Sequence, residues 1–193
     1  MIIYYYKDKE IKIRDICEDD AAVLFVWSIS EDLNKYDPKP IPVNSSALLK
    51  ECKSFCDKFD NNIMNETSIL NEYKYFIVEN NEERQIGFVN LFGFNEDKTD
   101  AELGVVVGDK TFWNKGIAYK SVKAVIEYAF KELQLSRIHI ETGEKNTAAL
   151  RLFSKLGFKK CDEYCEDCGF KFIVMESFAK EKYGIRKRSK NTI

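Results

Sequence analysis

Three apolar runs separated by turn-forming residues constrain the fold of this chain more than any other feature. Alternating or continuous apolar residues between asparagine-containing turns are typical of β-strands. The runs are YKYFIVE (73–79), QIGFVNLFGF (85–94) and AELGVVVG (101–108). The next run, YKSVKAVIEYAFKELQL (119–135), repeats its apolar residues at helical spacing and indicates an amphipathic helix. This change of period predicts strands and helices within one mixed α/β unit.

Further strands and helices are expected on both sides of this central block. We expect extended backbone over 4–14, a helix over 21–33 capped by Asp19, a proline loop over 37–42, a helix over 46–59 after Asn44, a polar loop over 61–71, a strand over 137–144, a helix over 146–157 and a strand over 170–178. The predicted fold class is α/β, with a mixed, mostly antiparallel central sheet of about seven strands flanked by helices. We expect one domain over 1–183 and a basic tail over 184–193.

The composition excludes several functional classes. With 30 basic and 32 acidic side chains, the net charge of -2 gives no general attraction to nucleic acid. No apolar run approaches the ~18 residues that span a bilayer, and no secretory signal pattern opens the chain. We therefore expect a cytoplasmic protein with no nucleic-acid and no membrane partner. The basic residues near the end of the chain are interpreted as a solvated terminus.

The six cysteines leave two interpretations open. In a reducing compartment they are small, adaptable side chains, and structural disulfides are not expected. Cys165 and Cys168 also have the spacing of half a zinc site, to be completed by Cys52, Cys56 or Cys161. We expect no metal, because a CxxC pair supplies only two of the four usual ligands.

The stretch FWNKGIA (112–118) lies between a predicted strand and a predicted helix. Helix N-termini carry unpaired backbone N–H groups and the positive end of the helix dipole, so such a loop can hold a phosphate. Gly116 would leave room for the phosphate, Ala118 would allow a close approach, and Lys115 would add positive charge. A plain strand-to-helix connection is the alternative on these residues alone.

Two motifs resemble those of the GNAT superfamily of N-acetyltransferases. Its pyrophosphate loop runs Arg or Gln, two residues, Gly, one residue, then Gly or Ala, which here are Trp113, Gly116 and Ala118. Tryptophan in the first place is common in the ribosomal-protein N-terminal acetyltransferase branch. The second motif is Asn146 with Lys155-Leu-Gly-Phe158 nine residues on. The resemblance is specific over about 101–158 and implies the acyl-CoA N-acyltransferase fold of that superfamily.

The resemblance implies that acetyl-CoA binds where two neighbouring strands separate. Strand backbone would hold the pantetheine arm, the loop would hold the pyrophosphate, and Asn146 would bind the coenzyme arm. The residues expected to contact the coenzyme are Val105, Val106, Val107, Trp113, Asn114, Lys115, Gly116, Ile117, Ala118, Asn146, Phe153 and Lys155. For the three valines, a place in the buried sheet core is the alternative.

Members of this superfamily transfer the acetyl group directly to an amine, so no metal is required. A carboxylate helps to remove the amine proton. Glu141 and Glu102 are the candidate bases, with Asp100 a weaker third. Glu141 is preferred over Glu102 because it lies five residues before Asn146, as in N-terminal acetyltransferases, although each glutamate could instead be a solvated side chain on the sheet. The single histidine, His139, excludes catalysis by paired histidines.

The general acid is unassigned. Phe153 stands where many relatives have a tyrosine that protonates the leaving thiolate, and candidate substitutes are Tyr119, Tyr164 and Ser121. A rival function is therefore a non-catalytic acyl-CoA sensor or interaction domain, with a zinc-bound module ranked last.

The expected acceptor is a primary amine, either a peptide or protein N-terminus or a small molecule. Acidic residues in the acceptor regions could attract a cationic amine: Glu31, Asp32, Asp37, Glu163, Glu166 and Asp167. The resemblance also allows a homodimer.

Overall fold

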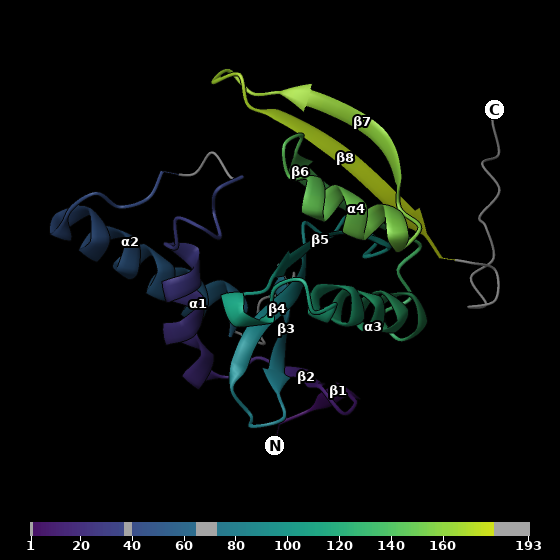
Figure 1. Cartoon of the computed structure of the whole chain (residues 1–193), viewed down its shortest axis with the longest axis horizontal. Coiled ribbons are helices and arrows are strands. Elements are labelled where there is room, and N and C mark those ends of the chain that lie inside the picture. Colours follow the sequence, from purple (N-terminus) through teal and green to yellow (C-terminus); the bar gives the residue numbers. More distant parts are fainter. Residues whose placement is uncertain (1, 37–39, 65–72, 180–193) are drawn as a thin grey trace.

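The computed structural model describes residues 2–36, 40–64 and 73–179 (Figure 1). Its strands are β1 (Tyr4–Lys7), β2 (Ile11–Asp15), β3 (Tyr73–Asn80), β4 (Gln85–Phe92), β5 (Asp100–Val106), β6 (Arg137–Gly143), β7 (Lys159–Cys165) and β8 (Lys171–Phe178). Its α-helices are α1 (Ala21–Ser28), α2 (Ser45–Lys58), α3 (Ile117–Lys131) and α4 (Thr147–Lys155). No helix in these ranges combines the length and the apolar character that crossing a membrane requires.

The described strands form one 8-stranded sheet with the order β1-β2-β3-β4-β5-β6-β8-β7. Every neighbouring pair is antiparallel except β5 and β6, which are parallel. The predicted α/β class with a mixed, mostly antiparallel sheet is confirmed. The strand that sequence patterns missed is β7, whose seven residues are all exposed and so lack an alternating apolar pattern.

The two faces of the sheet carry separate apolar cores. On one face, α3 and α4 pack through Val122, Val125 and Phe153 against strand residues such as Phe76 and Val89. On the other face, α1 and the end of α2 pack against β3 and β4; this second core contains Leu24, Trp27, Phe59, Ile77 and Phe88. The sheet therefore separates the α3–α4 side from the α1–α2 side, as Figure 1 also shows.

The predicted cap at Asp19 is wrong, because the neighbouring Asp20 has the structural role. The Asp20 carboxylate is buried and accepts hydrogen bonds from the Cys17 N–H (2.8 Å) and from Arg14 Nη1 (2.7 Å). Arg14 Nε also donates to Glu79 Oε1 at 2.6 Å. This buried network holds β2, β3 and the start of α1 together, and α1 ends at Ser28, earlier than the predicted end at residue 33.

The second helix follows its sequence signal more closely. Asn44 caps α2 by accepting a hydrogen bond from the Ala47 N–H at 2.9 Å, as predicted. The predicted polar loop is wrong over 61–63, because Phe59–Ile63 continues α2 as one π-helical turn. Residues 65–71 of that loop, residues 37–39 of the proline loop and the basic tail lie outside the described residues.

Candidate active site

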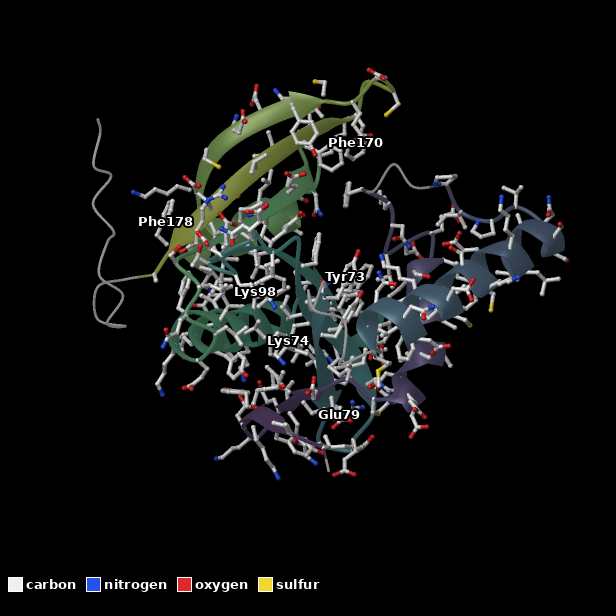
Figure 2. The ribbon with its side chains drawn as sticks, turned by 180° about the vertical axis from the view of Figure 1, so that it is seen from behind. Tyr73, Lys74, Glu79, Lys98, Phe170 and Phe178 are labelled. Carbon is white, nitrogen blue, oxygen red and sulfur yellow. The ribbon has the colours of Figure 1, made fainter. Side chains whose placement is uncertain are left out.

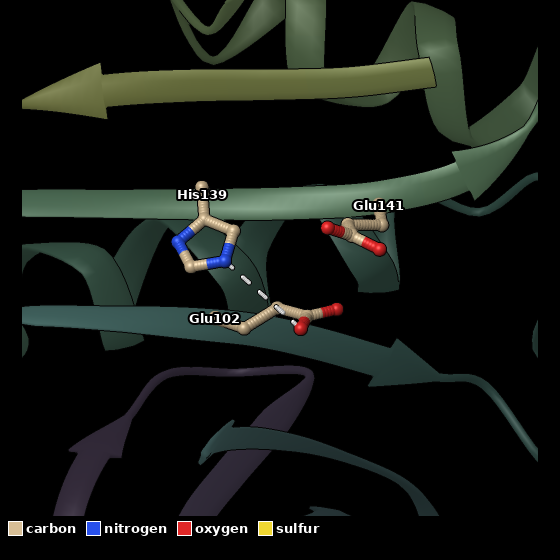
Figure 3. A group of neighbouring side chains, drawn as sticks. All are labelled: Glu102, His139 and Glu141. Carbon is tan, nitrogen blue, oxygen red and sulfur yellow. Dashed lines mark ion pairs between the residues drawn. The ribbon is translucent and has the colours of Figure 1, made fainter. Parts of the chain in front are cut away.

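The parallel ladder between β5 and β6 is short, and the two strands separate beyond it. Only 100–102 of β5 pair with β6, opposite 137–139. Beyond this ladder, β5 continues to pair with β4 as far as Val106, while β6 pairs with β8 as far as Gly143. Figure 3 shows the two ribbons moving apart toward their carboxyl ends. We call this place, with 103–106 on one side and 140–143 on the other, the β5–β6 fork.

Two of the three valines predicted to hold the coenzyme arm lie on β5 in the fork. Val105 and Val106 pair with β4 on one side and have no strand partner on the β6 side within the described sheet. Val107 lies just beyond the strand, and its carbonyl oxygen accepts a hydrogen bond from Trp113 Nε1 at 2.7 Å. The β6 side of the β5 backbone is therefore unpaired here and could be bound by an extended ligand.

The loop after β5 enters α3 through two residues with left-handed backbone. Asn114 has φ 59° and Gly116, immediately before α3, has φ 79°. The N-cap residue of α3 is Gly116, which has no side chain to cap the helix, and the hydrogen-bond ladder begins with the Lys120 N–H, which donates to the Gly116 carbonyl oxygen at 3.1 Å. A Cβ atom on Gly116 would have no other atom within 4 Å. An anion could approach the N–H groups and the positive dipole end from this open side.

The other residues of this loop differ in which of their groups could contact a ligand. The Ile117 side chain is buried in the core, so only its backbone could contact a ligand. Ala118 is half-buried at the start of α3. The Lys115 ammonium lies 5.4 Å from the centre of the Phe112 ring and stays close to the loop. We call Asn114 to Ala118 the α3 cradle.

The three predicted coenzyme residues on and next to α4 have different surroundings. Asn146 caps α4, since its Oδ1 accepts from the Ala149 N–H at 3.2 Å, and its Nδ2 donates to Thr142 Oγ1 at 3.1 Å. The Phe153 ring is buried and packs edge-on against another aromatic ring of the core. Lys155 is exposed, with its ammonium 4.7 Å from the centre of the Tyr119 ring. Of the three side chains, Phe153 is buried, Asn146 is half-buried and Lys155 is exposed.

Both candidate bases lie at the fork, but their environments differ. Glu102, on β5, and His139, on β6, face each other in the last rung of the parallel ladder. Glu141, two residues further along β6, brings one oxygen atom within 4.8 Å of the polar atoms of the other two (Figure 3). Burial, with a smaller contribution from the Glu141 carboxylate, raises the pKa of Glu102 to about 7. Glu141 itself is exposed and accepts a hydrogen bond from the Tyr164 hydroxyl.

Sequence reasoning gave His139 no role at this site. Its Nδ1 lies 3.0 Å from Asp100 Oδ1, and its Nε2 lies 4.0 Å from Glu102 Oε2. The signal was present in RIHIETG, where Arg137, His139 and Glu141 alternate with apolar residues and so share one face of a strand. The partner strand could not be identified from local sequence.

The candidate general acids are not equally available. The Ser121 hydroxyl is buried and donates to the Ile117 carbonyl oxygen at 2.9 Å, so its proton already has an acceptor. The Tyr164 hydroxyl is exposed but donates to Glu141, and this hydrogen bond is the main cause of its raised pKa. Tyr119 lies beneath the Lys155 ammonium at the start of α3.

Aromatic rings cover the α1–α2 face of the sheet beside the fork. Tyr73 stacks on Phe92 with ring centres 6.1 Å apart, and the Trp27 ring stacks on Phe88 at the same distance. Phe170 approaches Gly143 at the end of β6 from the β7–β8 hairpin. Figure 2 shows Tyr73 on β3 and Phe170 at the hairpin end. An acceptor on this face would meet aromatic rings as well as the carboxylates of the fork.

The predicted acidic lining is partly neutralised. Asp32 forms an ion pair with Lys110, and Glu163 pairs with Lys160 and, at 2.8 Å, with Lys171. Asp37 lies outside the described residues. The thiols do not gather into a group of three or more metal-type ligands anywhere in 2–36, 40–64 and 73–179, which include all six cysteines.

Comparison with known proteins defines the class to which this fold and site belong. The model of the acetyltransferase (GNAT) domain matches residues 10–159, and the chain belongs to that family. The resemblance to the GNAT superfamily is thereby confirmed, while the ribosomal-protein branch remains a prediction.

Individual relatives agree with this family. An uncharacterized protein from Methanocaldococcus jannaschii is 27% identical over 80% of this chain. An N-acetyltransferase 9-like protein from Caenorhabditis briggsae is 36% identical over 52%. The matches span 29% and 55% of the lengths of these two relatives. The fold matches that of the spermidine N-acetyltransferase from Vibrio cholerae solved with CoA and spermine, with a TM-score of 0.74 and 19% identity over 92% of this chain and 100% of that chain.

Proposed function

We propose that this protein is an acetyl-CoA-dependent N-acetyltransferase that moves the acetyl group directly to a primary amine. One observation carries the proposal: the carboxylate of Glu102 lies where β5 and β6 separate, next to an unpaired strand edge that leads to the open α3 cradle. A coenzyme site and a base are thus adjacent in one part of the fold.

The residues present fit the coenzyme in two respects. The unpaired backbone of Val105 and Val106 could bind an extended amide-containing arm as an added strand would. The N–H groups of the α3 cradle could hold a pyrophosphate, with Lys115 adding positive charge. Asn146 would serve the coenzyme through the remaining hydrogen-bonding capacity of its amide, because both of its polar atoms already have protein partners.

Acetyl transfer requires a general base that removes a proton from the acceptor amine. An amine attacks a thioester only in its neutral form, and a base works best when its pKa lies near the working pH. Glu102, with its pKa raised to about 7, meets that condition and is our first choice over Glu141. Backbone N–H groups at the fork would stabilise the oxyanion. Tyr119 and Tyr164 remain candidates to protonate the leaving thiolate.

The proposed acceptor is a cationic amine. Glu102 and Glu141 supply negative charge at the fork, and aromatic rings beside them favour an ammonium group. A polyamine is one candidate, since the Vibrio cholerae structure holds spermine. A peptide or protein N-terminus is the other, as expected for the ribosomal-protein branch.

Thiol release from acetyl-CoA tests this function directly. The amine panel should contain peptides with varied first residues, polyamines, aminoglycosides and free amino acids, with CoA binding followed by calorimetry. We expect release with one amine class, and loss of release in Glu102→Gln with CoA affinity unchanged. CoA binding without release for any amine would favour the acyl-CoA sensor, and no CoA binding would refute both functions.

A further inference from the structure

A chain of polar side chains leads away from Glu102 across the sheet. His139 lies between Glu102 and Asp100, facing the first through Nε2 at 4.0 Å and the second through Nδ1 at 3.0 Å. The second oxygen of Asp100 accepts a hydrogen bond from Arg137 Nη1 at 2.5 Å. Arg137 Nε in turn donates to Glu176 Oε2 at 2.7 Å. The four groups beyond Glu102 fix one another, and all are half-buried.

This arrangement defines which nitrogen of His139 carries a hydrogen atom. Asp100 is ion-paired with Arg137, so its carboxylate is ionised and can only accept hydrogen bonds. The Nδ1 atom of His139 must therefore be the donor to Asp100. In the neutral imidazole, Nε2 then presents its lone pair toward Glu102.

We propose that His139 is a positioning residue that receives the proton which Glu102 removes from the acceptor amine. The inference rests on the proposed function. In the first step an N–H bond of the acceptor ammonium breaks and an O–H bond forms on Glu102. In the second step that O–H bond breaks, an N–H bond forms at His139 Nε2, and the imidazolium later releases its proton to water. A side-chain rotation or one water molecule closes the 4.0 Å separation.

The surrounding charges support a transient imidazolium. Negative groups outnumber positive ones around the ring, and Asp100 stabilises the charged ring through Nδ1. The titratable groups that face Glu102 and His139 are Asp100 on β5, Arg137 and Glu141 on β6, Tyr164 on β7 and Glu176 on β8.

Nuclear magnetic resonance of the full chain tests the geometry without any assay of activity. The sequence has one histidine, so its ring signals need no assignment. With a chelator present to remove trace metal, we expect the Nδ1–H tautomer at high pH. We also expect a lower titration midpoint in Glu102→Gln, because a negative neighbour is lost. An Nε2–H tautomer, or an unchanged midpoint in Glu102→Gln, would overturn the proposal.

Kinetics then separate a proton-accepting role from a purely structural one. His139→Gln and Asp100→Asn should each lower kcat by about tenfold, less than the ~100-fold or more that losing the base costs. The double variant, His139→Gln with Asp100→Asn, should lower kcat no further than either single variant, since the two residues act together. In His139→Gln the rising limb of the pH profile should also move to lower pH, because the neutral Nε2 acceptor that favours the protonated form of Glu102 is gone.

Glu132→Gln is the matched control, since Glu132 is exposed and directly follows α3, and it should change neither kcat nor the pH profile. A wild-type kcat in His139→Gln, or a lower kcat with an unmoved pH limb, would overturn the proposal. Absence of thiol release from the wild-type protein with every amine would instead refute the proposed function, and the resonance experiment would still decide the geometry.

Discussion

Gly116 allows the phosphate-binding role of the α3 cradle to be separated from its structural role. Its φ of 79° lies in the left-handed region, where a residue with a Cβ atom loses about 1–2 kcal/mol. The added Cβ would contact no other atom within 4 Å, so no clash adds to that cost. For a chain of this size, ~1 kcal/mol corresponds to about 2–4 °C in Tm. Gly116→Ala should therefore fold and lose only a few degrees.

Gly169 is a matched control because its backbone is almost the same. It has φ 78°, a Cβ atom added to it would also have no other atom within 4 Å, and it lies at the β7–β8 hairpin, away from α3. Gly169→Ala and Gly169→Glu should match the Tm losses of the corresponding Gly116 variants. CoA affinity should fall only in the Gly116 pair.

The magnitude for Gly116→Glu follows from charge repulsion. Two like charges about 4 Å apart near a protein surface repel by about 4 kcal/mol, and each ~1.4 kcal/mol is tenfold in affinity. CoA should bind roughly 100- to 1,000-fold more weakly to Gly116→Glu by isothermal calorimetry, once partial screening is allowed for. Equal CoA affinities in the wild type, Gly116→Glu and Gly169→Glu would refute the cradle.

Three further outcomes follow from the fork and the cores. Burial raises the pKa of Glu102 from 4.5 to about 7, so its contribution to stability is complete below pH 4.5 and is lost as the pH rises through 7. Glu102→Gln should therefore raise Tm by a few degrees at pH 8 but not at pH 4 in calorimetry, and equal changes at both would contradict this. Phe153→Tyr should lose about 1–3 kcal/mol in urea unfolding without raising kcat, because its hydroxyl would be buried against Phe158; a higher kcat would oppose this. Gly108→Ala places a Cβ atom 2.0 Å from Trp27, so it should lose about 1–3 kcal/mol and alter tryptophan fluorescence; an unchanged spectrum would count against that packing.

The sequence predicted the structure best where an element depends only on residues close to it in sequence. The strands before α3, the α3 helix and the Asn44 cap could all be predicted, because apolar period and capping chemistry are local. Asp19 failed as a cap because the buried ion pair of Arg14 with Asp20 decides which aspartate is held, and Arg14 is itself held by Glu79, 65 residues away in sequence. The strand β7 failed because its hydrogen bonds to β8, rather than any apolar pattern, make it a strand.

Both glutamates could be proposed as candidate bases from the sequence. The difference between them in burial could not. The register of β5 on β6 joins residues 37 positions apart and places Glu102 opposite His139. No local pattern contains this information, which is why His139 had no predicted role.

The position of the fork explains why one glutamate suits the role of base better than the other. Glu102 stands at the last paired rung, where β6 still covers it and burial disfavours its charge. Glu141 stands beyond that rung, where the strands have separated and its carboxylate is exposed to water. The same separation that frees the β5 backbone for a ligand therefore leaves one of the two carboxylates half-buried and the other exposed.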